Sequence, residues 1–154
     1  MTLQDLGNLG EFVAAIATLI TLIYLAAQIR QNTRDVRSSA FQQVVDSFSG
    51  ISLEIGLNRE VSELLDRGSE GLSSLDSVER RRYWSVLLSF FRRAESVFFQ
   101  SEQGTLQLES WEGIREFLRS VLQSQGVREF WDENSLAFNS RFRTFVESEL
   151  LERS

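Results

Sequence analysis

The sequence contains no cysteine, no histidine and no proline, and glycine occurs only nine times in 154 residues. Without cysteine there is no disulfide and no thiol nucleophile, and without histidine the commonest general base and the commonest transition-metal ligand are missing. We therefore expect no zinc, haem or thiol chemistry, and we predict no cofactor. Because proline and glycine are the strongest interruptions of helices, this composition favours an all-α fold.

Positive charge is also scarce, with 16 basic against 22 acidic residues and a formal net charge of -6. Nucleic-acid binding depends on clustered cations that displace counterions, so we predict no nucleic-acid partner. The hydrophobic share of 42% and the charged share of 25% are those of an ordinary folded chain. At this length we expect one modest helical core, supplied mainly by twelve Phe and three Trp.

One long apolar run, FVAAIATLITLIYLAA, covers residues 12–27 without a charge, and apolar neighbours lengthen it to 9–29. A helix needs about 20 apolar residues to cross the bilayer core. A cleaved signal peptide would begin with basic residues, whereas here Asp5 and Glu11 precede the run. We predict a retained transmembrane helix at 9–29 after a short segment at 1–8. Burial of this helix between the subunits of a soluble assembly stays open.

Basic residues follow the apolar run, at Arg30, Arg34 and Arg37. The positive-inside rule places such residues on the cytoplasmic side of a membrane. We therefore predict a bacterial inner (cytoplasmic) membrane protein with its N-terminus outside and residues 30–154 in the cytoplasm. The three membrane-proximal arginines are long enough to reach anionic lipid of the bilayer.

A more polar stripe follows one face of the apolar helix, at spacings that are close to multiples of 3.6. Its members are Glu11, Thr18, Thr21, Leu25, Gln28 and Asn32. Small and polar residues favour the association of helices in lipid, so this stripe is a candidate intramembrane association or pore face and predicts a homo-oligomer. The alternative is that the threonines are merely tolerated, with their hydroxyls bonded to the preceding helical turn.

Apolar residues continue at helical spacing after the anchor, as far as Ile55. We predict one continuing amphipathic helix that Gly50 interrupts weakly and that ends near Gly56 and Asn58. A short helix near Glu60–Arg67 should stop at Gly68, followed by a loop over residues 68–74.

Asp76 and Glu79 have the spacing of a capping box and predict a helix from Ser77 to about Gln103, closed by Gly104. Two further helices are expected, at Leu108–Gln123 and Val127–Leu151, with Gly126 between them. Short links favour antiparallel packing, so the fold prediction is all-α: a long N-terminal membrane helix that continues into a cytoplasmic antiparallel helical bundle.

The helix that starts at Ser77 carries an apolar face and five arginines. The apolar face comprises Trp84, Leu87, Leu88, Phe91, Val97 and Phe98, and the arginines are Arg80, Arg81, Arg82, Arg92 and Arg93. Aromatic residues at helical spacing are usually core, which is how we interpret them. Arginine clusters can bind phosphate or anionic lipid, but solvation or pairing with glutamates of the same helix is the favoured interpretation.

Several segments resemble a widespread group of uncharacterised bacterial proteins. They are GEFVAAIATLITLIYLAAQIRQNT, FFRRAESVFFQ, GTLQLESWEG and GVREFW, which together span nearly the entire chain. Such proteins carry an N-terminal hydrophobic helix, a QIRQNT-like motif and an aromatic-rich helical C-terminal region. The resemblance implies a membrane-associated, all-α chain and no particular activity. Where the pattern commonly has proline before the GVREFW-like segment, this chain has Ser124 and Gln125.

These observations favour a structural or interaction role, in which the anchors associate and the cytoplasmic parts pack into a homo-oligomer or onto an unknown protein partner. One alternative is a homo-oligomeric ion channel or pore lined by the polar stripe, with Leu25 as a hydrophobic constriction. A lipid-binding or signalling accessory role is another.

Catalysis is the least favoured function. Without His or Cys it would depend on carboxylates, Tyr or a carboxylate-held magnesium ion. The acidic pairs Glu109 with Glu112 and Asp132 with Glu133 offer no recognisable catalytic geometry, and on helices they are expected to face water. We therefore predict that the chain is not an enzyme.

Overall fold

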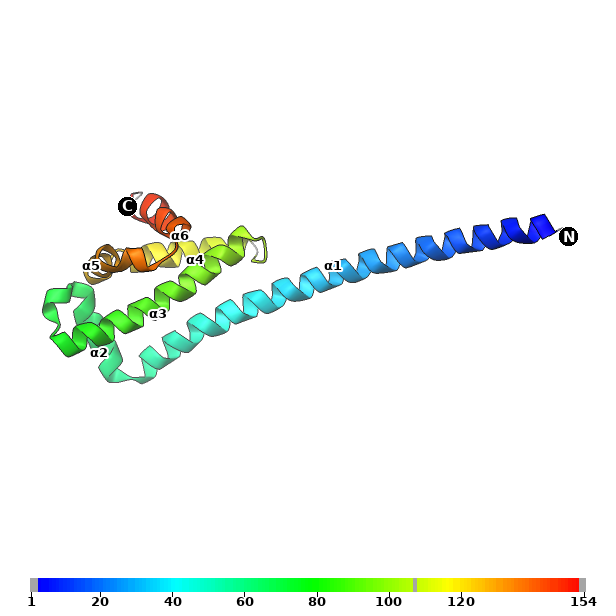
Figure 1. Ribbon diagram of the computed structural model, residues 1–154. Helices are drawn as coiled ribbons and strands as arrows, with labels where there is room; N and C mark the ends of the chain where they lie inside the picture. Colours follow the sequence, from blue (N-terminus) through cyan, green and yellow to red (C-terminus); the bar gives the residue numbers. More distant parts are fainter. Residues whose placement is uncertain (1–2, 107, 153–154) are drawn as a thin grey trace. The chain divides into compact units, whose positions relative to one another are not determined.

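The computed structural model describes residues 3–106 and 108–152 and confirms the all-α prediction, with no strand among those residues (Figure 1). Residues 1–2, 107 and 153–154, which the predicted segments include, lie outside this range, as do the side chains of Asp5 and Leu9. The helices are α1 (Leu3–Leu57), α2 (Arg59–Glu70), α3 (Ser77–Glu102), α4 (Leu108–Val121), α5 (Gln125–Asn134) and α6 (Ser140–Phe145). Shorter helical turns are η1 (Leu72–Ser74), η2 (Ser135–Ala137) and η3 (Val146–Leu151).

The predicted continuous N-terminal helix is confirmed, because α1 runs through the apolar run and on to Leu57. The weak interruption predicted at Gly50 is wrong, since Gly50 lies within the unbroken helix. It ends where expected: Asn58 caps α2, its Oδ1 accepting the Val61 amide at 3.3 Å. The chain divides within α1 into two compact units, Met1–Ser39 and Ala40–Ser154. Ten residues, 30–39, therefore separate the predicted end of the membrane segment from the second unit.

Helix α3 forms the centre of the second unit and begins at the predicted capping box. Asp76 Oδ1 accepts the amides of Val78 and Glu79, both at 2.8 Å, and Glu79 Oε2 accepts the Asp76 amide at 3.2 Å. Gly104 follows the end of α3 with a φ of 68°, a conformation that glycine adopts without steric cost. The prediction of this helix and of both its ends is confirmed.

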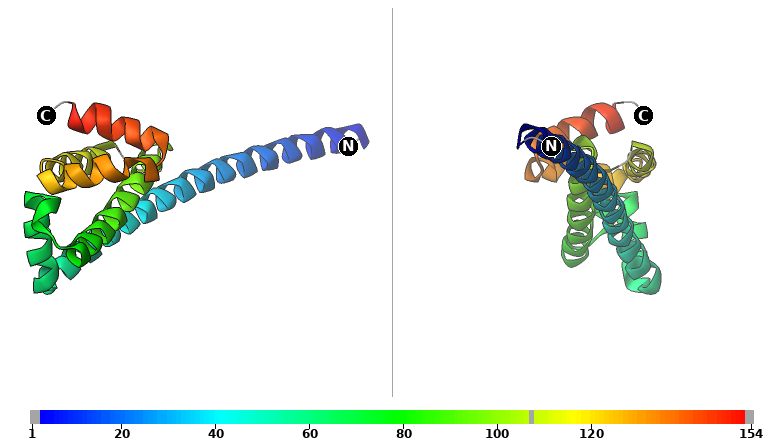
Figure 2. Two further views of the ribbon diagram at one scale, coloured as in Figure 1. Left: turned by 60° about the vertical axis from the view of Figure 1, so that its left-hand side comes forward. Right: turned by 90° about the vertical axis from the view of Figure 1, so that its right-hand side faces the viewer.

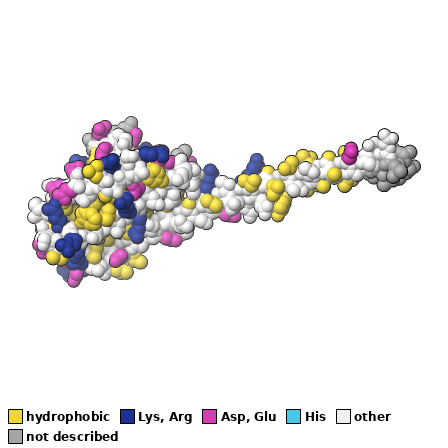
Figure 3. Space-filling view, viewed as in Figure 1, with side chains coloured by type: hydrophobic (Ala, Val, Ile, Leu, Met, Phe, Trp, Pro, Cys, Tyr) yellow, Lys and Arg dark blue, Asp and Glu magenta, His cyan; other side chains and the backbone are white. Residues whose placement is uncertain are grey.

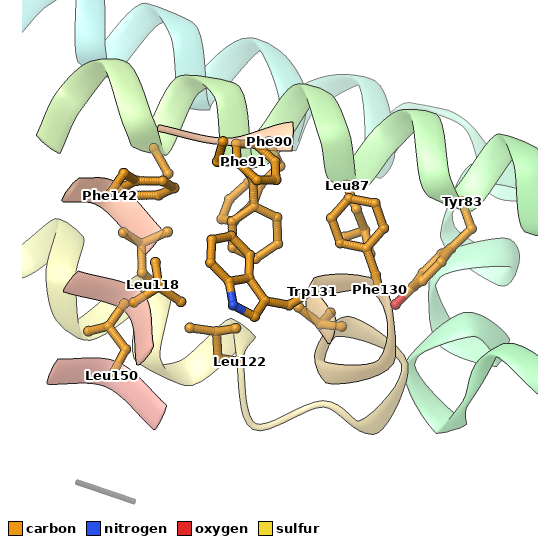
Figure 4. Packing of buried hydrophobic residues seen from close by; sticks show 14 of the residues in the cluster. Tyr83, Leu87, Phe90, Phe91, Leu118, Leu122, Phe130, Trp131, Phe142 and Leu150 are labelled. Atoms are coloured by element: carbon orange, nitrogen blue, oxygen red, sulfur yellow. The ribbon is translucent and has the colours of Figure 1, made fainter. Parts of the chain in front are cut away.

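The aromatic residues form the core, as predicted (Figure 4). Trp131 of α5 is stacked on Phe138 with ring centroids 5.3 Å apart, and Phe91 of α3 contacts the same indole at 5.0 Å. Trp84, by contrast, is 36% exposed and donates from Nε1 to Asn134 Oδ1 at 2.6 Å. Tyr83 and Phe90, which the apolar-face prediction omitted, are buried instead.

Two predictions based on glycine were wrong. Helix α2 does not stop at Gly68 but continues to Glu70, and Gly71 ends it with a φ of 143°. Gly126 does not separate two helices, since it lies in the first turn of α5 after Ser124. Both glycines instead permit a close approach of α2 and α5, because a Cβ on Gly126 would lie 1.7 Å from the Gly68 carbonyl oxygen. The predicted loop 68–74 accordingly contains the end of α2 and η1.

The predicted helix Val127–Leu151 is broken in the structure. Helix α5 ends at Asn134, and α6 begins only after Asn139, whose Oδ1 accepts the Arg141 amide at 2.9 Å. Glu95 of α3 accepts the Asn139 amide at 2.6 Å, which holds the break against the bundle. Asparagine competes with helical hydrogen bonding through its own side chain, and the apolar periodicity did not take this into account.

The C-terminal part of α1, from Ala40 onward, packs on this bundle, which Figure 2 shows from two further directions. Ala40 and Val44 are buried, and the ring of Phe48 meets that of Phe90 edge-on at 5.8 Å. Arg93 of α3 donates from Nη1 to the Ser47 carbonyl oxygen at 3.1 Å.

Candidate functional site

Residues 3–39 form the N-terminal part of α1, and their described side chains are all exposed (Figure 3). An 18-residue window of α1 between Gly10 and Leu57 has a mean hydropathy of 2.2, and none of it is buried. This N-terminal helix is long and apolar enough to span a membrane. The core helix of a soluble protein can be equally long and apolar, but such a helix is mostly buried, and a signal sequence near the N-terminus can have the same length and composition.

The six stripe residues all lie on this unbroken helix, so the structure brings them onto one face of α1. All six are exposed. The Thr18 hydroxyl donates to the Ala14 carbonyl oxygen at 2.9 Å, and the Thr21 hydroxyl donates to the Ala17 carbonyl oxygen at 2.8 Å. Each hydroxyl proton is thus used within the helix, as the alternative interpretation expected, and each hydroxyl oxygen keeps its capacity to accept.

The three membrane-proximal arginines also lie on one face of α1, because Arg30, Arg34 and Arg37 are spaced by four and three residues. Their side chains are exposed. None of them forms an ion pair within the part of the chain that the structure describes. Their charges are therefore available to an external anion.

An apolar groove lies between α4 and residues 41–53 of α1, with a volume of about 1020 Å³. Its exposed apolar residues are Phe41, Val45, Leu53 and Phe117. Its one charged lining residue among those described is Glu109. The sequence does indicate this groove, since α1 carries apolar residues here in addition to buried Ala40 and Val44 and partly buried Phe48.

A smaller cavity of about 300 Å³ adjoins the groove. It shares Phe48, Ser52 and Phe117 with the groove and extends inward to Tyr83. Burial raises the pKa of the Tyr83 hydroxyl, which is hydrogen-bonded to Ser124. The sequence does not indicate this cavity, because its walls come from five helices and no single periodicity marks them.

The five arginines of α3 do not form an anion site. Arg80 pairs with Glu133 at 2.5 Å, Arg92 with Glu95 at 2.8 Å, and Arg82 with Glu60 at 3.6 Å. Arg93 binds the Ser47 carbonyl, and Arg81 is exposed. Pairing or solvation is therefore confirmed, although most partners come from other helices rather than from α3 itself.

The carboxylates considered for catalysis are all exposed, as expected for residues that face water. Among the described residues, no group of three or more acidic side chains could hold a metal ion. Glu129, by contrast, makes specific contacts: its pKa is lowered by hydrogen bonds from the Gln125 side chain and the Leu72 amide. It joins α5 to η1 and has a structural role.

The chain matches no family model, no curated protein and no solved structure. The resemblance to uncharacterised bacterial membrane proteins therefore stays a prediction.

Proposed function

We propose that this chain is a single-pass membrane protein that self-associates through α1 and presents its helical domain as a structural or interaction module in the cytoplasm. The observation that carries the proposal is the apolar stretch of α1, whose described side chains are all exposed. In the proposed orientation, residues 9–29 cross a bacterial inner membrane, with the N-terminus outside and residues 30–154 inside.

The exposed apolar side chains of α1 make lipid a more favourable environment than water for this helix. Nine Phe, Val, Ile and Leu side chains between residues 12 and 29 are exposed. At about 0.3 to 0.6 kcal/mol each on an insertion scale, they contribute about 3 to 5 kcal/mol toward membrane insertion. The uncharged stretch between Glu11 and Arg30 spans about 27 Å, close to the thickness of a bilayer core.

Association of α1 with another copy is supported by the hydrogen-bonding capacity of the stripe. Thr18 and Thr21 use their protons within the helix, so their oxygens serve as acceptors. Gln28 and Asn32 carry amide donors on the same face. Hydrogen bonds between transmembrane helices typically contribute about 0.6 to 2 kcal/mol each. A few such contacts suffice for a small oligomer.

The mass of the protein after membrane fractionation and gentle detergent extraction tests this proposal. Light scattering, with the detergent contribution subtracted, should give a defined oligomer. Thr18→Leu with Thr21→Leu removes the polar atoms and adds bulk to the stripe, so the oligomer should dissociate. Ala15→Leu with Ala26→Leu adds bulk on another face of α1 and should leave the mass unchanged.

An unchanged mass in the threonine variant would reject the stripe as the interface. A defined oligomer also makes ion flux in liposomes the test of the pore alternative, because one span per subunit forms a pore only in an assembly. A soluble oligomer would contradict the membrane proposal and favour burial of α1 between subunits.

A further inference from the structure

The inner end of the cavity beside Tyr83 is lined by apolar side chains and by three hydroxyls that already have partners, those of Ser69, Tyr83 and Ser124. The Ser69 hydroxyl donates to the Asp66 carbonyl oxygen at 2.6 Å, and the Ser124 hydroxyl donates to the Ser69 carbonyl oxygen at 3.0 Å. The Ser124 hydroxyl proton is therefore already used. In the hydrogen bond between Ser124 and Tyr83, the buried Tyr83 hydroxyl is the donor and the Ser124 oxygen is the acceptor. None of the residues described around the cavity is charged. A molecule bound at the inner end therefore needs no polar group to satisfy the hydroxyls there.

The dimensions of the cavity suit a slender apolar molecule. A volume of about 300 Å³ holds roughly ten groups of the size of water or methylene. Apolar cavities of this kind exclude water and accept hydrocarbon, because water inside them lacks hydrogen-bond partners. An unbranched hydrocarbon chain satisfies both the volume and the chemistry.

The groove provides the exit for the polar end of such a molecule. Cavity and groove meet at Phe48, Ser52 and Phe117, and the groove is open to solvent. Phe117 is 50% exposed at this junction. The carboxylate of Glu109 lines the groove and would repel an anionic head group. An uncharged head group meets no such repulsion and can bond to the serine hydroxyls there.

We propose that the helical domain binds a single-chain lipid with an uncharged head group, such as a monoacylglycerol. The acyl chain occupies the cavity beside Tyr83, and the head group lies in the groove between α1 and α4. This site is separate from the lipid that would surround residues 9–29, and it does not depend on self-association.

Photo-crosslinking of the full-length protein in liposomes tests the site. The probe is monododecanoylglycerol with a diazirine near the methyl end of its chain, and the cross-linked peptides are identified by mass spectrometry. Labelling should fall on peptides that contain residues 48–55, 83–90 and 117–127. Excess unlabelled monododecanoylglycerol should reduce it by about tenfold, and dodecanoate should reduce it less.

Ser52→Phe provides the matched variant, because exposed Ser52 lines the junction and a benzyl group there closes it. This change should reduce labelling by about tenfold. Ser38→Phe, on an exposed part of α1 outside both spaces, should not. If circular dichroism shows that the Ser52→Phe variant does not fold, Val86→Phe is used instead, because it fills the cavity from α3. Labelling confined to residues 9–29, equal labelling of the filled and control variants, or cross-links to a second copy at these positions would overturn the proposal.

Discussion

At the scale of single residues, the contact between Gly68 and Gly126 constrains the bundle most tightly. A Cβ on Gly126 would lie 1.7 Å from the Gly68 carbonyl oxygen and 3.3 Å from the Tyr83 hydroxyl. A Cβ on Gly68 would meet the Tyr83 ring at 2.4 Å. Helices α2, α3 and α5 therefore meet at two residues that have no side chain. A side chain at position 126 would collide with the backbone of Gly68, which cannot rotate aside as a side chain can.

Gly126→Ala should accordingly destabilise the domain by about 3 kcal/mol or more, since overpacking against backbone forces α2 and α5 apart. Gly113→Ala is the matched control: Gly113 lies inside α4 with nothing within 4 Å of a built Cβ. Alanine there should stabilise the fold by about 0.5 to 1 kcal/mol. Denaturant midpoints of the full chain in detergent measure both changes. Equal midpoints for the two variants would contradict this account of the contact.

Glu129 gives the fold a dependence on pH. Hydrogen bonds from Gln125 and from the Leu72 amide hold its pKa below the ordinary 4.5 of glutamate. A lowered folded-state pKa contributes stability above the unfolded pKa, and this contribution is lost as the pH falls through the folded value. Glu129→Gln should therefore lower the unfolding temperature at pH 7 and flatten its decline below pH 4.5 relative to the natural chain. Parallel unfolding curves from pH 7 to pH 3 would contradict this assignment.

At the scale of elements, the capping box of α3 links two helices. Asp76 satisfies the amides of Val78 and Glu79, and Glu79 also accepts from Arg67 Nη2 of α2 at 2.6 Å. Asp76→Ala should cost about 1 kcal/mol, because both amides lose their acceptor. Asp76→Ser retains an N-cap oxygen and should cost less. Thermal unfolding of the two variants compares them, and equal losses would mean that the cap contributes through charge alone.

The ends of the helices show which features of the sequence predict structure reliably. Asp76 with Glu79, and Gly56 with Asn58, are local signals with a local mechanism, so the bounds of α3 and the end of α1 could be predicted. Gly68 and Gly126 were misinterpreted because a glycine that breaks a helix and one that admits a neighbouring helix look alike in sequence. The break at Asn139 depends on Glu95, a residue 44 positions earlier, and periodicity along one helix does not reveal such a contact.

At the scale of the whole molecule, the proposed function requires that lipid surrounds the first unit. The stripe from Glu11 to Asn32 could be predicted, since it needs only an unbroken helix. The groove and the cavity beside Tyr83 could not, because each requires the packing of residues from distant parts of the chain. The central claim is that residues 9–29 cross a membrane and leave the helical domain in the cytoplasm.

Single-cysteine labelling in intact bacterial cells tests that claim most directly, because the natural chain has no cysteine and therefore no background. Asn8→Cys and Ser73→Cys both place the thiol at exposed positions, one before the apolar run and one in the domain. A maleimide that cannot cross the inner membrane should label Asn8→Cys in intact cells and Ser73→Cys only after the membrane is opened. Labelling of Ser73→Cys in intact cells, or protection of both variants with the protein in the soluble fraction, would contradict the account.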